Sequence, residues 1–526
     1  MLNIVLSVLL AGIPVLPRPH EDATLDPGKI EPGQPPSVII CQQPTGGGWR
    51  PVIMSGEAHN NLLWLEPGKL AFLGSDVAGT NWEGASVWYS EDNGSTWTKY
   101  NINATVINRV YPDAFIDRTT GTPWYAYQIR VPGTASMIYV AKDEGAGIGA
   151  PGIFSEYQVT AGEGTYGEWL PTVVAKGDTV VVSYMKYDLG VGACKTSFDG
   201  GETWGDEVII DENQAIDNPN LIFVEPNTLV FFSFDGDIID TIIFWKSTDW
   251  GQTWSGPFKL ESSAVQYGFA SWWYSYVGVA YQGKVHVLAV LSPSGIENGI
   301  LYDYIYDPAT DEITEEFVVG YVYFDSTSNA WSVGIPQART PSVGVTQDGS
   351  KLVAMFMNYD ESGSYKDPYF MVYDGNSWSD YAPVFAVADT FDEGRGDFCP
   401  TVYDDGEYLN LFFVCSSGSV SYANIYYAGA QVTTPPSVNE ARPFSTLNVK
   451  PTLVTRNFNI EFAVSKLAEV EVAVYNTAGQ KVADLYKGTL NAGSHRLTFD
   501  ANFGKGIYFV TVTVDGKSTS RKILVK

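Results

Sequence analysis

A set of polar and aromatic residues recurs at one position of a repeated sequence unit, directly before a short apolar stretch typical of a β-strand. The set consists of His59, Arg109, Tyr111, Glu168, Trp169, Asp217, Trp272, Trp273, Arg339, Arg395 and Asp397. Aromatic faces stack on sugar rings, and arginine forks bind carboxylates or hydroxyls. The set therefore indicates a glycan site. A polar rim whose arginines only pair with carboxylates has the same composition and remains an alternative.

The repeated unit that must position these residues is a strand, a turn and a second strand, approximately P-x-h-x-h followed by G-x-h-x-h-x-h, where h is apolar. Its copies begin at Leu62, Pro112, Pro171, Pro219, Tyr274, Pro341 and Pro400. We predict an all-β fold in which residues 37–430 form a seven-bladed β-propeller with four strands per blade, so that the set lines the mouth of its channel. The last copy has room for three strands, and Ser37–Cys41 is predicted to supply the fourth and close the ring.

A second motif, Ser-x-Asp-x-Gly-x-Thr-Trp, occurs three times. Its residues are Ser90, Asp92, Gly94, Thr96 and Trp97; Ser197, Asp199, Gly201, Thr203 and Trp204; and Ser247, Asp249, Gly251, Thr253 and Trp254. Weaker copies lie at Lys142–Gly145 and Tyr373–Trp378. The carboxylate and hydroxyls can bond the backbone of a hairpin tip, glycine supplies φ > 0, and tryptophan packs beneath. We expect a fold-stabilising role. The motif resembles the Asp-box, or BNR repeat, of sialidase-like β-propellers.

The sialidase-like resemblance continues through residues 68–97, GKLAFLGSDVAGTNWEGASVWYSEDNGSTW. That family acts on the sugar with a Tyr nucleophile, a Glu partner, an acid/base Asp and three arginines. This chain departs from the pattern, because Ala58, His59 and Asn60 stand where the family's first arginine is expected, and Arg339-Thr340-Pro341 lies in the wrong blade. True sialidase activity is therefore not expected.

A fainter resemblance is to polysaccharide lyases built on seven-bladed propellers, the ulvan-lyase-like group. It is carried by His59-Asn60-Asn61, Tyr111-Pro112 and Arg130. The resemblance implies that Tyr111 and His59 act as base or acid and partner, while Arg130 neutralises a uronate carboxylate. The family's second histidine has no counterpart in the stretch SDVAGT. Whether the chain is an enzyme stays open. If it is one, we expect a polysaccharide lyase or a glycoside hydrolase.

Both ends of the chain carry export signals. The apolar run Leu2–Leu16 is shorter than a membrane span and predicts a signal peptide over 1–17, followed by a Pro-rich linker over 18–36; a hydrophobic first strand is the alternative. After a linker at 431–450, residues 451–526 alternate as in a small Ig-like β-sandwich. With its Tyr-Asn-x-x-Gly turn and basic last strand, this segment resembles the C-terminal type A sorting domain of type IX secretion cargo. The resemblance implies a bacterial protein that the type IX outer-membrane translocon delivers outside or to the outer-membrane surface.

Charge and composition exclude other functions. The 526 residues carry a net charge of −29, which disfavours nucleic acid as a partner. Four cysteines, Cys41, Cys194, Cys399 and Cys415, could pair in any of three complete connectivities. No cofactor or metal is expected, although Asp235, Asp237 and Asp240 leave calcium as an alternative.

Together these features predict a secreted or cell-surface propeller that binds an acidic glycan at the channel mouth, with cleavage left open and no membrane span. The alternative is a non-catalytic adhesin or surface-layer scaffold that uses the propeller for protein contacts.

Overall fold

The computed structural model consists of strands and turns. It describes residues 38–44, 61–74, 77–78, 81–82, 85–102, 112–129, 133–146, 150–235, 241–262, 269–293, 299–319, 322–325, 330–333, 339–359, 366–379, 381–384, 395–418, 422–434, 448–450, 453–454, 456–464, 467–476, 480–491, 493–514 and 517–526. Within these ranges every regular element is a β-strand. The described residues include no helix that is long and apolar enough to cross a membrane. The all-β prediction is confirmed.

By its internal contacts the chain divides into two compact units. One, called the ring unit here, comprises Glu21–Gly320 and Ile335–Pro435. The other, called the C-terminal unit, comprises Met1–His20, Tyr321–Gly334 and Pro436–Lys526. The hairpin of β24(Val322–Asp325) and β25(Ala330–Val333) groups with the C-terminal unit. The predicted propeller bounds of 37–430 stay a prediction.

Five separate antiparallel sheets of the ring unit each contain four strands hydrogen-bonded in chain order. The first sheet consists of β2(Leu62–Glu66), β3(Lys69–Gly74), β6(Ser86–Ser90) and β7(Thr98–Asn101). A small separate hairpin, β4(Val77–Ala78) and β5(Asn81–Trp82), lies between β3 and β6 in the sequence. The second sheet consists of β8(Asp113–Asp117), β9(Thr122–Ile129), β10(Met137–Asp143) and β11(Phe154–Gln158). The next three are β12(Glu168–Lys176), β13(Thr179–Lys186), β14(Val191–Ser197) and β15(Val208–Ile209); β16(Ile216–Val224), β17(Thr228–Asp235), β18(Thr241–Ser247) and β19(Ser255–Glu261); and β20(Phe269–Tyr281), β21(Lys284–Pro293), β22(Ile300–Asp307) and β23(Glu312–Val319).

The remaining strands of the ring unit form one nine-stranded sheet, in the order β1-β33-β32-β31-β26-β27-β28-β29, with β30 also paired to β32. Its strands are β1(Val38–Pro44), β26(Arg339–Thr346), β27(Leu352–Tyr359), β28(Lys366–Tyr373), β29(Ala382–Pro383), β30(Arg395–Phe398), β31(Thr401–Asp404), β32(Leu409–Gly418) and β33(Tyr422–Val432). The strand predicted at Ser37–Cys41 is β1, and it pairs antiparallel with β33 as expected. The chain's first described strand thus completes the sheet of its last ring strands.

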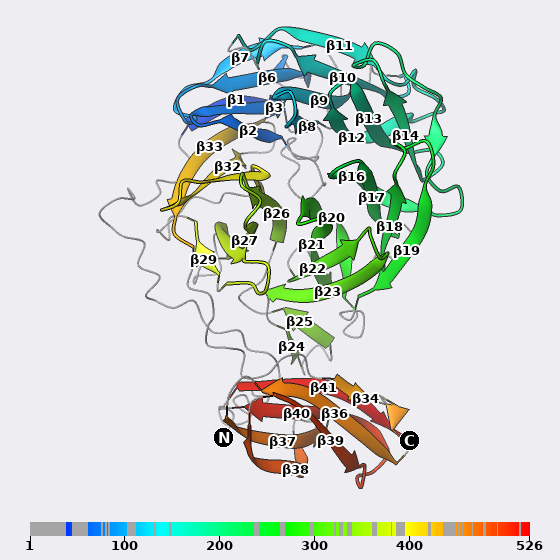
Figure 1. Cartoon of the computed structure of the whole chain (residues 1–526), viewed down its shortest axis with the longest axis vertical. Helices are drawn as coiled ribbons and strands as arrows, with labels where there is room; N and C mark the ends of the chain where they lie inside the picture. The colour runs from blue at the N-terminus through cyan, green and yellow to red at the C-terminus, as the bar shows by residue number, and fades with distance from the viewer. Residues whose placement is uncertain are drawn as a thin grey trace. The chain divides into compact units, whose positions relative to one another are not determined.

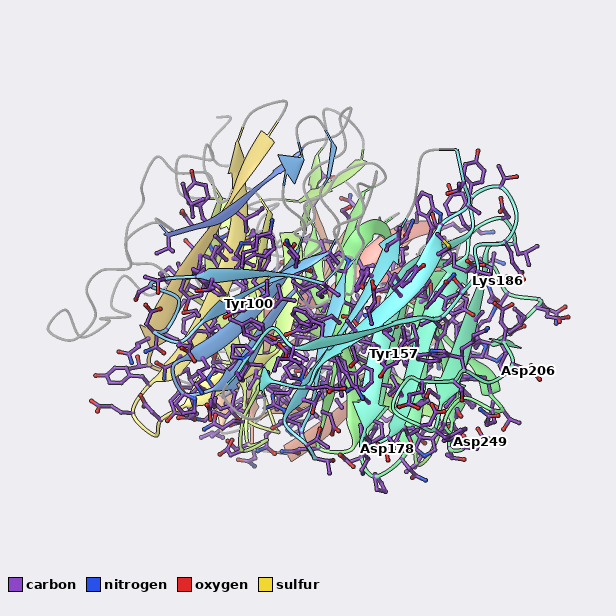
Figure 2. The ribbon with its side chains drawn as sticks, turned by 90° about the horizontal axis from the view of Figure 1, so that it is seen from above. Tyr100, Tyr157, Asp178, Lys186, Asp206 and Asp249 are labelled. Carbon is purple, nitrogen blue, oxygen red and sulfur yellow. The ribbon has the colours of Figure 1, made fainter. Side chains whose placement is uncertain are left out.

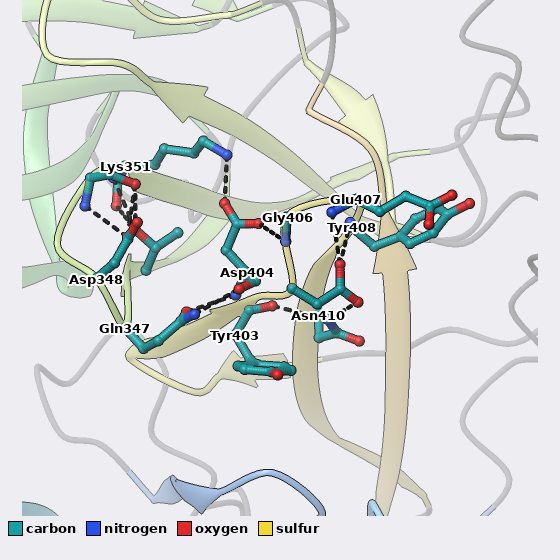
Figure 3. A network of polar contacts seen from close by, with 12 residues as sticks. Gln347, Asp348, Lys351, Tyr403, Asp404, Gly406, Glu407, Tyr408 and Asn410 are labelled. Carbon is teal, nitrogen blue, oxygen red and sulfur yellow. Dashed lines mark hydrogen bonds and ion pairs between the residues drawn. The ribbon is translucent and has the colours of Figure 1, made fainter.

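Strands β26 and β31 join the two halves of this sheet in parallel, through Val345 with Thr401 and Thr346 with Val402. Polar contacts fasten the same junction (Figure 3): the amide of Gln347 donates to the carbonyl of Asp404 (2.6 Å) and accepts from its N–H (2.7 Å), and Lys351 Nζ lies 2.5 Å from the Asp404 carboxylate.

Seven strands contact one another in a closed circle, β2 to β8, β12, β16, β20, β26, β31 and back to β2. The first five each begin a four-stranded sheet, and β26 and β31 both belong to the nine-stranded sheet. Viewed along the shortest axis of the molecule, the sheets of the ring unit surround a common centre (Figure 1). The core lies between neighbouring sheets; Val181 and Cys194 of one sheet pack with Phe231 of the next. Because neighbouring sheets cover both faces of inner strands such as β13, these are apolar on both sides, whereas fourth strands such as β19 are largely exposed.

One of the four cysteines, Cys194, is a buried free thiol, and burial raises its pKa to about 12. Each complete pairing would need Cys194 in a disulfide. None of the three complete disulfide connectivities is therefore present.

Bulges interrupt the first strands near their beginnings. The pairing register shifts between Trp169 and Thr172 in β12, between Asp217 and Asn220 in β16, and between Arg339 and Ser342 in β26. The prolines predicted to open these strands, Pro171, Pro219 and Pro341, lie inside the bulges instead, and the strands begin two or three residues earlier. Proline lacks the N–H that a ladder needs, so a bulge accommodates it.

The three Ser-x-Asp-x-Gly-x-Thr-Trp segments form closely similar turns between the third and fourth strands of their sheets. In the first, Asp92 accepts from the Thr96 N–H (2.8 Å) and hydroxyl (2.6 Å), while the Ser90 hydroxyl accepts from the Gly94 N–H (2.7 Å). The same contacts recur at Ser197–Trp204 and Ser247–Trp254. The glycines have φ of 84°, 94° and 82°. Donation by Thr203 lowers the pKa of Asp199 to about 2. These contacts are those expected of turns that stabilise the fold.

The C-terminal unit contains a three-stranded sheet, β34-β36-β39, and a five-stranded sheet, β35-β41-β40-β37-β38. The strands are β34(Asn448–Lys450), β35(Leu453–Val454), β36(Asn457–Val464), β37(Ala468–Asn476), β38(Lys481–Leu490), β39(Gly493–Asp500), β40(Gly506–Val514) and β41(Lys517–Val525). Their alternating apolar residues, among them Phe458, Val472 and Val510, share one buried core. This is the two-sheet arrangement predicted for 451–526.

Candidate functional site

The structure describes the predicted site residues to different extents. His59, Arg109, Tyr111 and Arg130 lie outside the described residues. Asp217, Trp272, Trp273, Arg339, Arg395 and Asp397 lie on described strands, but their side chains are not described. Trp169, Asp217 and Arg339 are the last paired residues before the bulges of β12, β16 and β26, so the backbone gives these three equivalent positions. Glu168 and Trp169 are described in full. The roles of the others stay predictions.

The strand starts and the turn motifs lie on opposite faces of the ring unit. Glu168 at the start of β12 pairs with Lys186 at the end of β13, whereas Asp178 lies in the turn at the other end of the same hairpin. In Figure 2, Lys186 lies toward one face, and Asp178 and Asp249 lie toward the other. We call the face of Lys186 the strand-start face. The three turns are therefore remote from Trp169.

Three aromatic side chains on the strand-start face, Tyr166, Trp169 and Tyr187, form what we call the aromatic platform. The rings of Trp169 and Tyr187 stack with centroids 4.4 Å apart and an interplanar angle of 29°, and Tyr166 lies 5.2 Å from Tyr187. Tyr166 is 44% exposed and Tyr187 41% exposed. Exposed aromatic rings grouped in this way are available to contact a ligand.

Backbone hydrogen bonds fix the platform in place. Asp188 accepts from the N–H groups of Thr165 (2.8 Å) and Tyr166 (2.9 Å), and the latter bond chiefly lowers the pKa of Asp188. The indole N–H of Trp169 donates to the carbonyl of Tyr166 (3.0 Å). Gly167 has a φ of 80°, and a Cβ there would lie 2.3 Å from the Ser136 carbonyl oxygen. The platform is thus preorganised and loses little conformational freedom on binding.

The bulge in β12 turns neighbouring side chains to opposite sides. Leu170, within it, has a φ of 54°, a left-handed conformation that is costly for a leucine. Directly before it, Trp169 joins the platform while Glu168 points inward and is 1% exposed. The Thr160 hydroxyl donates to the Glu168 carboxylate (2.9 Å), and burial raises its pKa. Glu168 was predicted as a ligand contact, but this structure places its carboxylate beneath the surface. Strain at such a bulge is typical of functional sites.

Carboxylates surround the platform. Lys186 lies 3.0 Å from the Glu163 carboxylate and 2.5 Å from that of Glu207, which also accepts from the Tyr184 hydroxyl (2.8 Å). Asp188 adds a further carboxylate directly after Tyr187. The lysine beside the platform is therefore fully engaged by acidic groups.

Tyr166 and Tyr187 were not among the predicted site residues. Tyr187 directly follows β13, whose last residues pair with the first residues of β12. Tyr187 could have been predicted by considering the ends of the second strands together with the starts of the first strands.

The calcium alternative stays untested, since Asp237 and Asp240 lie outside the described residues. In the part of the chain that is described, no group of three or more His, Cys, Asp or Glu side chains could hold a metal ion.

Comparison with known proteins identifies the C-terminal segment. Residues 449–526 match the family model of the secretion system C-terminal sorting domain. This domain indicates secretion through the type IX system to the cell surface or outside, which confirms the predicted localisation. No curated protein matches the chain.

Several solved structures of carbohydrate-active proteins are distantly similar. An α-L-arabinofuranosidase from Fusarium graminearum is 14% identical, over 60% of this chain and 92% of its own, with a TM-score of 0.40. An ulvan lyase is 12% identical, over 72% and 91%, with a TM-score of 0.40. A Hadza microbial sialidase is 12% identical, over 68% and 74%, with a TM-score of 0.32. Similarity this low carries no activity over to this chain.

Proposed function

We propose that this exported chain is a seven-bladed β-propeller that binds a glycan on its strand-start face, with the aromatic platform as the main contact. The closed circle of first strands from β2 to β31 supports the blade count, if the nine-stranded sheet is divided at the junction of β26 and β31. The three similar turns support the resemblance to Asp-box propellers.

The platform is the observation that carries the proposal. Tyr166 and Tyr187 are exposed, and Trp169, which is half-buried, is held by its hydrogen bond to the backbone, so the platform can receive the C–H face of a sugar. Nucleobases also stack on aromatic side chains, but a chain of net charge −29 repels the nucleic acid backbone.

Further parts of the proposal rest on the sequence. Arg109, Arg339 and Arg395 would bind carboxylates of an acidic glycan nearer the channel mouth. Cleavage, if any, would use His59, Tyr111 and Arg130 as in the lyase resemblance. The second candidate is an adhesin whose platform contacts a protein; Trp and Tyr are also enriched in the energetic centres of protein interfaces.

A glycan array followed by calorimetry on the full chain tests the proposal. Trp169→Ala should weaken binding of any captured glycan by about thirty-fold, the loss expected of a central aromatic contact worth about 2 kcal/mol. Phe198→Ala is the matched control, since Phe198 is 58% exposed in a turn on the opposite face. Capture of no glycan, or binding that survives Trp169→Ala, would contradict the proposal and favour the protein-binding alternative.

A further inference from the structure

We infer that the aromatic platform is a subsite for an uncharged sugar residue and discriminates against uronate and sulfated residues. This inference rests on the proposed function and names the substrate class of the same site. It differs from the acidic preference predicted from the arginines, which concerns other positions on the strand-start face.

The negative charge beside the platform determines which class of sugar can bind there. Glu163, on the loop that carries Tyr166 and leads into β12, has a side chain 72% exposed, and Asp188 follows Tyr187. A carboxylate or sulfate on a sugar stacked here would approach like charges in a partly exposed setting, where their repulsion is only partly screened.

The cation at this site cannot compensate for that repulsion. Lys186 is 11% exposed at its side chain and already contacts both Glu163 (3.0 Å) and Glu207 (2.5 Å). To bind an anionic sugar it would have to leave these carboxylates, and a carboxylate such as Glu207 would then lose its partner.

The shape of the platform agrees with an uncharged pyranose. Trp169 and Tyr187 stack on each other, so each covers one face of its partner; Tyr187, 41% exposed, keeps aromatic surface for a sugar ring, with its hydroxyl at the edge. A neutral ring can place C–H groups on that surface and its hydroxyls toward Glu163 and Asp188, which accept hydrogen bonds as carboxylates.

The test uses the full chain and matched pairs of soluble oligosaccharides that differ only in oxidation of C6 to a carboxylate, from β-glucan, galactan and mannan. Calorimetry should give at least one neutral member that binds about ten-fold tighter than its uronate partner, the effect of one to two screened charge contacts. Trp169→Ala should weaken binding of both members by about thirty-fold.

Charge reversal at the rim provides the second arm. Glu163→Lys should bring the neutral-to-uronate ratio to about three-fold or below, because the uronate then meets a cation in place of a carboxylate. Glu202→Lys is the matched control, because Glu202 is exposed in a turn on the opposite face; it should leave the ratio at its wild-type value.

The outcomes separate the two ideas. Tighter binding of the uronate member that is lost in Trp169→Ala overturns the inference and keeps the proposed function. A ratio that moves equally in both lysine variants also overturns it, because the effect is then one of net charge. An affinity that is unchanged in Trp169→Ala, or no binding of any pair, overturns both.

Discussion

Replacement of Asp143 by asparagine tests whether one buried carboxylate organises the connection between β10 and β11. Asp143 is fully buried and stands in the segment Lys142–Gly145, which the sequence marks as a weak copy of the turn motif. Its oxygens accept from five donors: the Tyr89 hydroxyl (2.8 Å) and the N–H groups of Gly145 (2.9 Å), Ala146 (3.1 Å), Gly152 (2.6 Å) and Ile153 (3.2 Å).

The geometry of these hydrogen bonds determines how much stability the substitution is expected to cost. An asparagine oxygen can keep the three bonds made to Oδ1, but its amide group then meets the Gly152 N–H, so that two donors face each other. One unsatisfied buried donor costs about 1–3 kcal/mol of unfolding free energy. Asp143→Ala leaves all five donors without this acceptor and should cost about 4 kcal/mol or more.

Denaturant unfolding of the full chain, followed by tryptophan fluorescence, measures this loss, because 14 of the 15 tryptophans belong to the ring unit. Glu144→Gln is the matched control; this neighbouring side chain is 50% exposed, and its substitution should change stability by about 0.5 kcal/mol or less. If Asp143→Asn behaves like Glu144→Gln, the carboxylate does not organise the connection and the reasoning fails.

Two other predictions concern the turns. The pKa of Asp199 is about 2, below the usual carboxyl value of about 4, so its contribution to stability is present above about pH 4 and is lost as the pH falls toward 2. Thermal midpoints between pH 5 and pH 2 should fall less steeply in Asp199→Asn, and an unchanged slope would refute this. Gly94 and Gly121 both have positive φ, but a Cβ at Gly94 would lie 1.9 Å from the Tyr427 ring, whereas nothing lies within 4 Å at Gly121. Gly121→Ala should cost about 1–2 kcal/mol and Gly94→Ala clearly more; equal losses would show that the turn does not pack against β33.

The parts of the fold that the sequence predicts are those with local chemical causes. Each turn motif carries its own donors, acceptors and glycine within eight residues, so its geometry needs no information from elsewhere. The pairing of β1 with β33 spans most of the chain, yet it follows from a strand missing in the last repeat. The bulges were not predicted. A proline shows that the ladder is interrupted but does not show that the strand continues on both sides of it.

Only part of the candidate site could be predicted from the sequence, because the site combines two strand ends and a loop. Trp169 follows from the repeat register, whereas Tyr187 requires the pairing of Glu168 with Lys186 across the hairpin. Glu168 was assigned to the surface because it precedes the strand in the repeat; its burial results from the alternation of side chains before Leu170. The direction of the Glu168 side chain cannot be predicted from residue spacing without knowledge of the bulge.

The two faces of the ring unit obey different constraints, and the chain's own repeats show why. The three turns have identical Ser, Asp, Gly, Thr and Trp residues, because each residue satisfies a fixed hydrogen bond or packs against a neighbouring strand. The residues directly before the bulges of β12, β16 and β26 are Trp, Asp and Arg. A bulge releases its neighbour from the regular ladder and re-aims its side chain, so the side chain can change from copy to copy without loss of the sheet. The face with variable residues is therefore the one that can acquire a ligand, and the aromatic platform lies on it.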